Sequence, residues 1–82
     1  MNAATNTAPP ARFTFSPGAL VLVLGPTYPA SRPDFKGRGV DGVTGLTMEV
    51  VEHRADDDVV LINEAGDPGS EVWIHASRLI AD

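Results

Sequence analysis

The chain has 82 residues, no cysteine and a formal net charge of −5, because eleven aspartates and glutamates outweigh six lysines and arginines. A chain of this length forms one domain at most, and its core must hold without disulfides or thiolate metal sites. The negative charge repels a phosphate backbone, so nucleic acid is not expected as a partner.

The sequence also bears on location. The longest apolar stretch, residues 19–24, is too short to span a membrane, so no membrane contact is expected. The N-terminus lacks the basic start and the apolar run of a secretion signal. We therefore expect a cytoplasmic protein, or one held within an assembled particle.

Residues 1–12 are predicted to form a flexible N-terminal tail, and residues 13–82 a single folded domain. The tail consists largely of small and polar residues and contains the pair Pro9-Pro10. Such a composition buries too little apolar surface to offset the entropy lost on ordering. The alternation Phe13-Thr14-Phe15 begins the folded part, and a turn is expected after it at Pro17-Gly18.

The apolar run at residues 19–24 is typical of a strand that is buried on both faces. Residues 25–45 follow it with five glycines and three prolines, which excludes a helix and predicts a long, ordered loop. Within the loop, residues 37–42 match the glycine spacing of a dinucleotide fingerprint. No strand runs into them and no helix follows, so these glycines are expected to permit sharp turns.

The rest of the chain is predicted to form an antiparallel meander. Apolar and polar residues alternate over 44–50, which predicts a half-buried strand with Thr44, Leu46, Met48 and Val50 on one face. A turn at 54–57 leads to a strand at 58–63, and a turn at 66–69 leads to a strand at 71–76. In that last strand Val72 and Ile74 share the core face, and Trp73 points the other way. A 3₁₀ turn at 77–79 and a short strand at Ile80 close the chain.

The closing segment Trp73-Ile74-His75-Ala76-Ser77-Arg78-Leu79 resembles the Trp-Ile-Pro-Ser-Asn-Tyr-Val ending of SH3-like small barrels. The long loop at 25–45 is similar in position to the RT loop of that family. The resemblance implies an all-β fold: a small SH3-like barrel of four to five antiparallel strands, with a long loop after the first strand and a 3₁₀ turn before the last. His75 and Arg78 stand where peptide-binding members have the Pro and Tyr of their proline-rich groove, so that ligand class is not implied.

No residues point to catalysis, a metal or a cofactor. His53 and His75 lie on strands that the third strand separates, about 10 Å apart, and are expected to be surface histidines. The serines occupy no activated turn. Residues 56–58 are three consecutive aspartates without the glycine and glutamate of a calcium loop, which indicates a solvated hairpin tip.

The residue that most favours a binding role is Trp73. Strand alternation sends it away from the core, where either a partner covers it or Phe13 or Phe15 folds over it. Tyr28 and Phe35 in the long loop are expected to extend this surface. The remaining candidate partner-binding residues are Arg32, Arg38 and His75.

The sequence therefore predicts a non-catalytic module or accessory subunit that binds a protein partner, or a second copy of itself, through an exposed aromatic surface. Two alternatives remain open. One is a small structural subunit of a larger assembly such as a phage virion, and the other is an acidic modulator that imitates nucleic acid.

Overall fold

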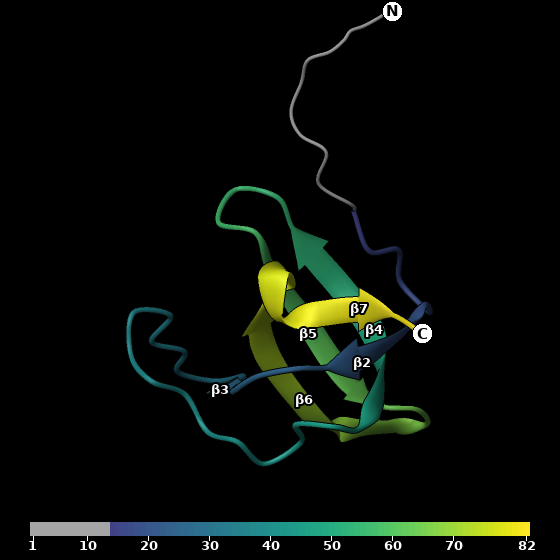
Figure 1. Ribbon diagram of the computed structural model, residues 1–82, viewed down its shortest axis with the longest axis horizontal. Coiled ribbons are helices and arrows are strands. Elements are labelled where there is room, and N and C mark those ends of the chain that lie inside the picture. Colours follow the sequence, from purple (N-terminus) through teal and green to yellow (C-terminus); the bar gives the residue numbers. More distant parts are fainter. Residues whose placement is uncertain (1–13) are drawn as a thin grey trace, which may run out of the picture.

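Antiparallel pairing of short, β-branched segments gives an open, six-stranded sheet within residues 14–82, the part of the chain that the computed structural model describes (Figure 1). The strands follow one another in the spatial order β3-β6-β5-β4-β2-β7. The predicted tail and Phe13 lie outside the described residues. The elements are β2 (Leu20–Val23), β3 (Tyr28–Pro29), β4 (Thr47–Arg54), β5 (Val59–Glu64), β6 (Asp67–His75), the 3₁₀ turn η1 (Ala76–Arg78) and β7 (Leu79–Ala81).

The all-β prediction is confirmed, and so are the long loop after the first core strand, the meander and the 3₁₀ turn before the last strand. The sheet has six strands where four to five were predicted, and several boundaries differ. The strand predicted at 44–50 is β4 at Thr47–Arg54, and the 3₁₀ turn predicted at 77–79 is η1 at Ala76–Arg78. The β5–β6 turn is the pair Ala65-Gly66, with Gly66 at a φ of 82°, so Asp67 already pairs with Glu64. The short strand β3 at the start of the long loop was not predicted. It pairs Tyr28 with Trp73 of β6.

The main core lies on one face of the sheet. Alternate residues of each strand meet there, as the period of two requires. Its fully or nearly buried members are Val21, Val23, Met48, Val50, Val60, Ile62, Ile74 and Leu79. Partly buried side chains, Phe15 among them, pack against this cluster.

The prediction that residues 19–24 are buried on both faces is wrong. Val21 and Val23 are fully buried, whereas Leu20 and Leu24 each remain 48% exposed. Leu22 of the same strand is half-buried, and none of the three leucines belongs to either buried cluster of the described residues. A continuous apolar run indicates a central strand, but here β2 has only one buried face.

A second, smaller cluster lies on the opposite face of β5 and β6. Its buried members are Tyr28, Val59, Leu61 and Trp73, and Phe35 from the long loop packs against them. The sequence alternation in 71–76 is therefore correct, because Ile74 belongs to the first cluster and Trp73 to the second. The second cluster fixes where the long loop lies.

Substitution of Ile62 by Ala should lower the free energy of unfolding by about 2–5 kcal/mol, because the fully buried side chain leaves a cavity in the core. The same change at Ile80, which is 51% exposed, should have a clearly smaller effect. Urea denaturation followed by circular dichroism measures both. Equal losses at the two positions would contradict the register described here, since a one-residue slip exchanges the two faces.

Candidate functional site

Four of the six residues predicted for partner binding form one cluster of rings. The Tyr28 ring centroid lies 5.5 Å from those of Phe35 and His75, with the rings close to perpendicular. Phe35 in turn lies 6.1 Å from Trp73 and 5.8 Å from His75. Edge-to-face contacts at such distances stabilise aromatic clusters beyond the area that they bury. These ring contacts hold the long loop against β3 and β6.

Of the two alternatives left open for Trp73, the structure favours the covered one, since only 9% of its surface is accessible. Trp73 does point away from the main core, but the ring of Phe35 in the loop packs against it, nearly perpendicular to the indole. The guanidinium carbon of Arg54 lies 5.2 Å from the ring centroid, a cation–π contact, and Arg54 also pairs with Asp57 at 2.7 Å. Phe15, one of the two residues expected to cover Trp73, instead packs on the main core, and Phe13 lies outside the described residues.

The histidines are not the surface residues that the sequence indicated. The side chain of His53 is only 6% exposed. The backbone N–H of Phe15 donates to its Nδ1 at 2.9 Å, so the ring proton sits on Nε2, which donates to Asp58 at 2.8 Å. His75 is half-buried and donates from Nε2 to the carbonyl oxygen of Phe35 at 3.0 Å.

The two histidines also lie on opposite faces of the sheet. His53 pairs with Val60 of the main core, and His75 pairs with Val59 of the second cluster. They cannot share a ligand from these positions. Within residues 14–82 no group of histidine, aspartate and glutamate side chains is arranged to hold a metal ion.

Three hydrogen bonds at Tyr28 and Arg78 fix the base of the long loop. The Tyr28 hydroxyl donates to the carbonyl of Gly37 at 3.0 Å and accepts from Arg78 Nη1 at 3.1 Å. The same nitrogen donates to the carbonyl of Pro26 at 3.1 Å. A Cβ at Gly25 would lie 2.8 Å from the Cδ of Arg78, so a larger residue there would displace the Arg78 side chain from this position.

Farther along the loop, Thr27 and Val40 exchange backbone hydrogen bonds of 2.9 and 2.8 Å. Gly39 lies at this crossing with a φ of 78°, and a Cβ there would stand 2.8 Å from the Thr27 carbonyl oxygen. The two hydrogen bonds between Thr27 and Val40 thus bring the two ends of the loop together. This agrees with the prediction of an ordered loop with glycines at its turns.

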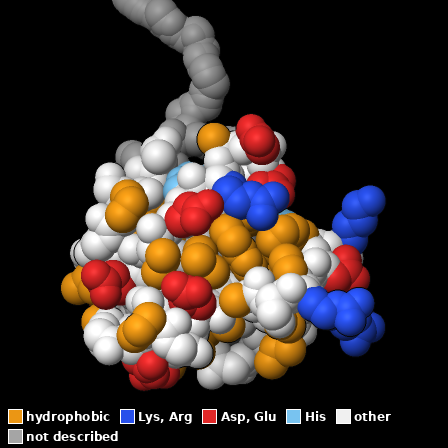
Figure 2. All heavy atoms as spheres, turned by 180° about the vertical axis from the view of Figure 1, so that it is seen from behind, with side chains coloured by type: hydrophobic (Ala, Val, Ile, Leu, Met, Phe, Trp, Pro, Cys, Tyr) orange, Lys and Arg blue, Asp and Glu red, His pale blue; other side chains and the backbone are white. Residues whose placement is uncertain are grey.

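Arg32 and Arg38 do not join the ring cluster. Both are exposed in the loop, as is Lys36 between them. Figure 2 shows an apolar area with basic side chains and an acidic one at the side where the long loop lies, and with a further basic group beside acidic ones at its upper border. The loop therefore presents positive charge next to a partly exposed apolar surface that includes Phe35.

Sequence reasoning missed Arg54, Arg78 and Lys36 as parts of this site. Lys36 was detectable, because it shares the loop with the two predicted arginines. Arg54 and Arg78 gave no such signal, since their contacts to Trp73 and Tyr28 depend on the pairing of strands that are distant in the sequence.

These observations define the class as a small all-β domain whose ordered loop is anchored by an aromatic cluster. No protein-family model, curated protein or solved structure matches the chain. No helix among residues 14–82 is long and apolar enough to cross a membrane.

Trp73 is the single tryptophan, so its environment can be followed by fluorescence. Replacement of Phe35 by Ala should shift the emission of Trp73 to longer wavelength and increase its quenching by acrylamide, because the ring packed against the indole is removed. Phe15→Ala is the control, since Phe15 packs on the other face of the sheet. Both variants are measured under conditions where they stay folded. If Phe15→Ala shifts the emission to longer wavelength and Phe35→Ala does not, Phe35 is not the residue that covers Trp73.

Proposed function

We propose that the domain is a non-catalytic protein-interaction module of the SH3-like small-barrel class. The order of elements supports the class: a core strand, a long loop, a three-stranded meander, a 3₁₀ turn and a short last strand. Arg78, next to the last strand, also bonds to Tyr28 of β3, the strand at the other end of the spatial order. This contact favours a sheet that curls until its ends approach each other.

The observation that carries the proposal is the rigid display of basic side chains beside an apolar surface. Tyr28 and His75 hold the backbone of the loop at Gly37 and Phe35, so Arg32, Lys36 and Arg38 extend from a fixed base. A preorganised loop loses little conformational entropy on binding. Arginine and aromatic residues beside each other are typical of energetically dominant positions in protein interfaces.

The charge distribution indicates the chemistry of the partner. The loop at 30–43 contains three basic and two acidic residues, whereas the whole chain has a net charge of −5. The surface next to Phe35 therefore suits a protein partner with acidic side chains around an apolar centre.

A proline-rich peptide is a less suitable ligand. The resemblance to peptide-binding barrels places His75 and Arg78 where the groove residues would stand. His75 donates to the Phe35 carbonyl and Arg78 to Tyr28 and Pro26, so both side chains are used to hold the loop.

The double variant Arg32→Ala and Arg38→Ala should bind the partner at least tenfold more weakly, about 1.4 kcal/mol, because it removes two exposed guanidinium groups from the loop. The partner is first captured by crosslinking in the native source, then purified and titrated by calorimetry at two salt concentrations. Higher salt should reduce the difference between wild type and variant.

The matched control is Ala65→Glu with Pro68→Glu, which changes the net charge by the same amount at exposed positions of the β5–β6 hairpin. Its affinity should remain within about threefold of wild type. An equal loss in both double variants would assign the effect to net charge, and an unchanged affinity in the loop variant would refute the proposed surface.

A further inference from the structure

The outer edge of β7 has backbone groups without partners among residues 14–82. Leu24 N–H donates to the Arg78 carbonyl, Asp82 N–H donates to the Leu20 carbonyl, and Ile80 is opposite Leu22. Residues 78, 80 and 82 therefore direct their backbone groups toward β2, and residues 79 and 81 direct theirs away from it.

Among the outward backbone groups of residues 79 and 81, the N–H of Leu79 alone has a partner within residues 14–82, because it donates to the Ala76 carbonyl. The carbonyl of Leu79 and both the N–H and the carbonyl of Ala81 have no hydrogen-bond partner in the described part of the chain. Their spacing of two residues is that of a strand edge ready for pairing.

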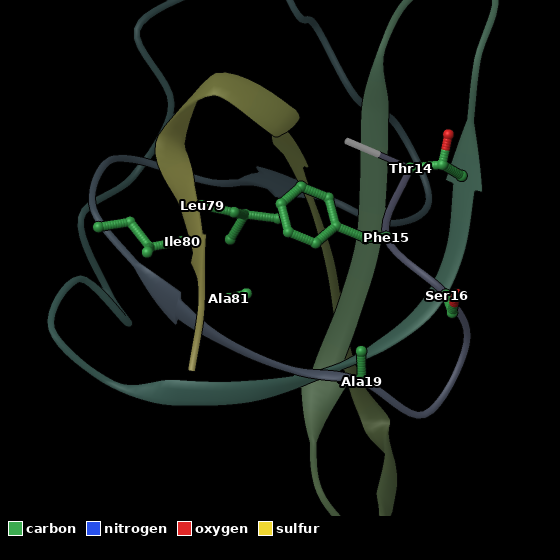
Figure 3. A pocket seen from close by; sticks show the side chains of 7 residues that line it. All are labelled: Thr14, Phe15, Ser16, Ala19, Leu79, Ile80 and Ala81. Carbon is green, nitrogen blue, oxygen red and sulfur yellow. The ribbon is translucent and has the colours of Figure 1, made fainter. Parts of the chain in front are cut away.

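An apolar hollow of about 390 Å³ lies next to this edge, between β7 and the segment before β2. In Figure 3 the Phe15 ring projects from that segment toward Leu79, and Ala19 and Ala81 flank it. The lining residues are Thr14, Phe15, Ser16, Ala19, Leu79, Ile80 and Ala81.

The wall opposite β7 is held in place. Phe15 donates its N–H to the buried ring of His53 at 2.9 Å, and the two rings lie 5.8 Å apart. The Gly18 N–H donates to the Val50 carbonyl at 2.8 Å. The hollow is therefore bounded by an anchored segment on one side and by an unpaired strand edge on the other.

We propose that β7 accepts an extended segment of a partner protein as an additional strand, with an apolar side chain of that segment seated against Phe15 and Leu79. Strand addition of this kind combines main-chain hydrogen bonds with pockets for alternate side chains. The free groups at Leu79 and Ala81 select an extended backbone, because neither a helix nor a small apolar molecule offers donors and acceptors at a two-residue spacing.

The charge at this edge indicates a basic segment. Asp82 lies at the end of β7, where its carboxylate accepts from the Thr47 hydroxyl at 2.8 Å. A second copy of the chain carries the same net charge of −5, so long-range repulsion disfavours pairing of two β7 edges. A partner strand with lysine or arginine beside its apolar residue fits both the hollow and the charge.

This site is independent of the loop surface proposed above. It shares no residue with the set Tyr28, Arg32, Phe35, Arg38 and Trp73, and Figure 1 shows the long loop and the end of β7 on opposite sides of the molecule. A substitution that abolishes binding at one surface is therefore expected to leave binding at the other unchanged.

The probe is a synthetic peptide, acetyl-Lys-Val-Thr-Val-Thr-Val-Lys-amide, titrated into the ¹⁵N-labelled full chain. We expect saturable amide shifts at Phe15, Ala19 and residues 79–82, and slower hydrogen exchange at the Ala81 amide. The double variant Arg32→Ala with Arg38→Ala should bind this peptide as wild type does, which separates the two proposals.

Two controls test the backbone pairing itself. A peptide of the same sequence with alternate amides N-methylated on its pairing edge should bind at least tenfold more weakly, because it cannot donate to the Leu79 and Ala81 carbonyls. Ala81→Pro removes the free N–H without removing a bond to β2 and should also weaken binding at least tenfold, whereas Ala81→Val should not. If Ala81→Pro does not fold, the N-methylated peptide decides. Equal binding of both peptides, shifts confined to the loop, or no shift at millimolar peptide would overturn the proposal.

Discussion

The Tyr28 hydroxyl is the interaction on which the arrangement of the loop depends. It donates to Gly37 in the loop and accepts from Arg78 beside the last strand, so one buried oxygen connects segments that are distant in the sequence. Its ring faces Phe35 and His75 and lies under the Arg78 guanidinium carbon, 5.8 Å from the centroid. A buried hydroxyl with both partners in place is stabilising, while the loss of either partner leaves an unpaired polar group in an apolar setting. The conformation of the loop and the cover over the second cluster therefore depend on the same contact.

The small size of the sheet imposes the second constraint. A chain with no cysteine must draw its stability from apolar burial, and here that burial is divided between two clusters on opposite faces. The first takes Val21 and Val23 but leaves Leu20 and Leu24 half exposed. Full burial of a leucine side chain is worth about 1.5–3 kcal/mol, so the outer face of β2 holds apolar surface that the described fold does not use. The second cluster is completed only because the loop returns Phe35 to the sheet.

Local patterns predicted most of the fold and less of the site. Alternation placed Ile74 in the core and Trp73 on the other face, because the period of two is fixed by backbone geometry. It could not show that Phe35 covers Trp73, since that contact joins two segments through a loop whose path depends on Tyr28 and Arg78. The same limit explains the two-sided burial wrongly expected for residues 19–24. Composition identifies an apolar strand, but it does not show that Val21 and Val23 face the core while Leu20 and Leu24 stay half exposed. Long-range pairing is the information that a single sequence lacks.

The uneven distribution of charge separates the two proposed surfaces. Outside residues 30–43, which contain three basic and two acidic residues, the chain has three basic and nine acidic residues. The loop is thus a local positive region on a negative molecule, and the end of β7 at Asp82 belongs to the negative part. Encounter with an acidic partner is favoured only at the loop, and encounter with a basic segment only away from it. Like-charge repulsion disfavours each partner at the other site. With the loop and the end of β7 on opposite sides of the molecule, occupation of one proposed surface leaves the other accessible (Figure 1).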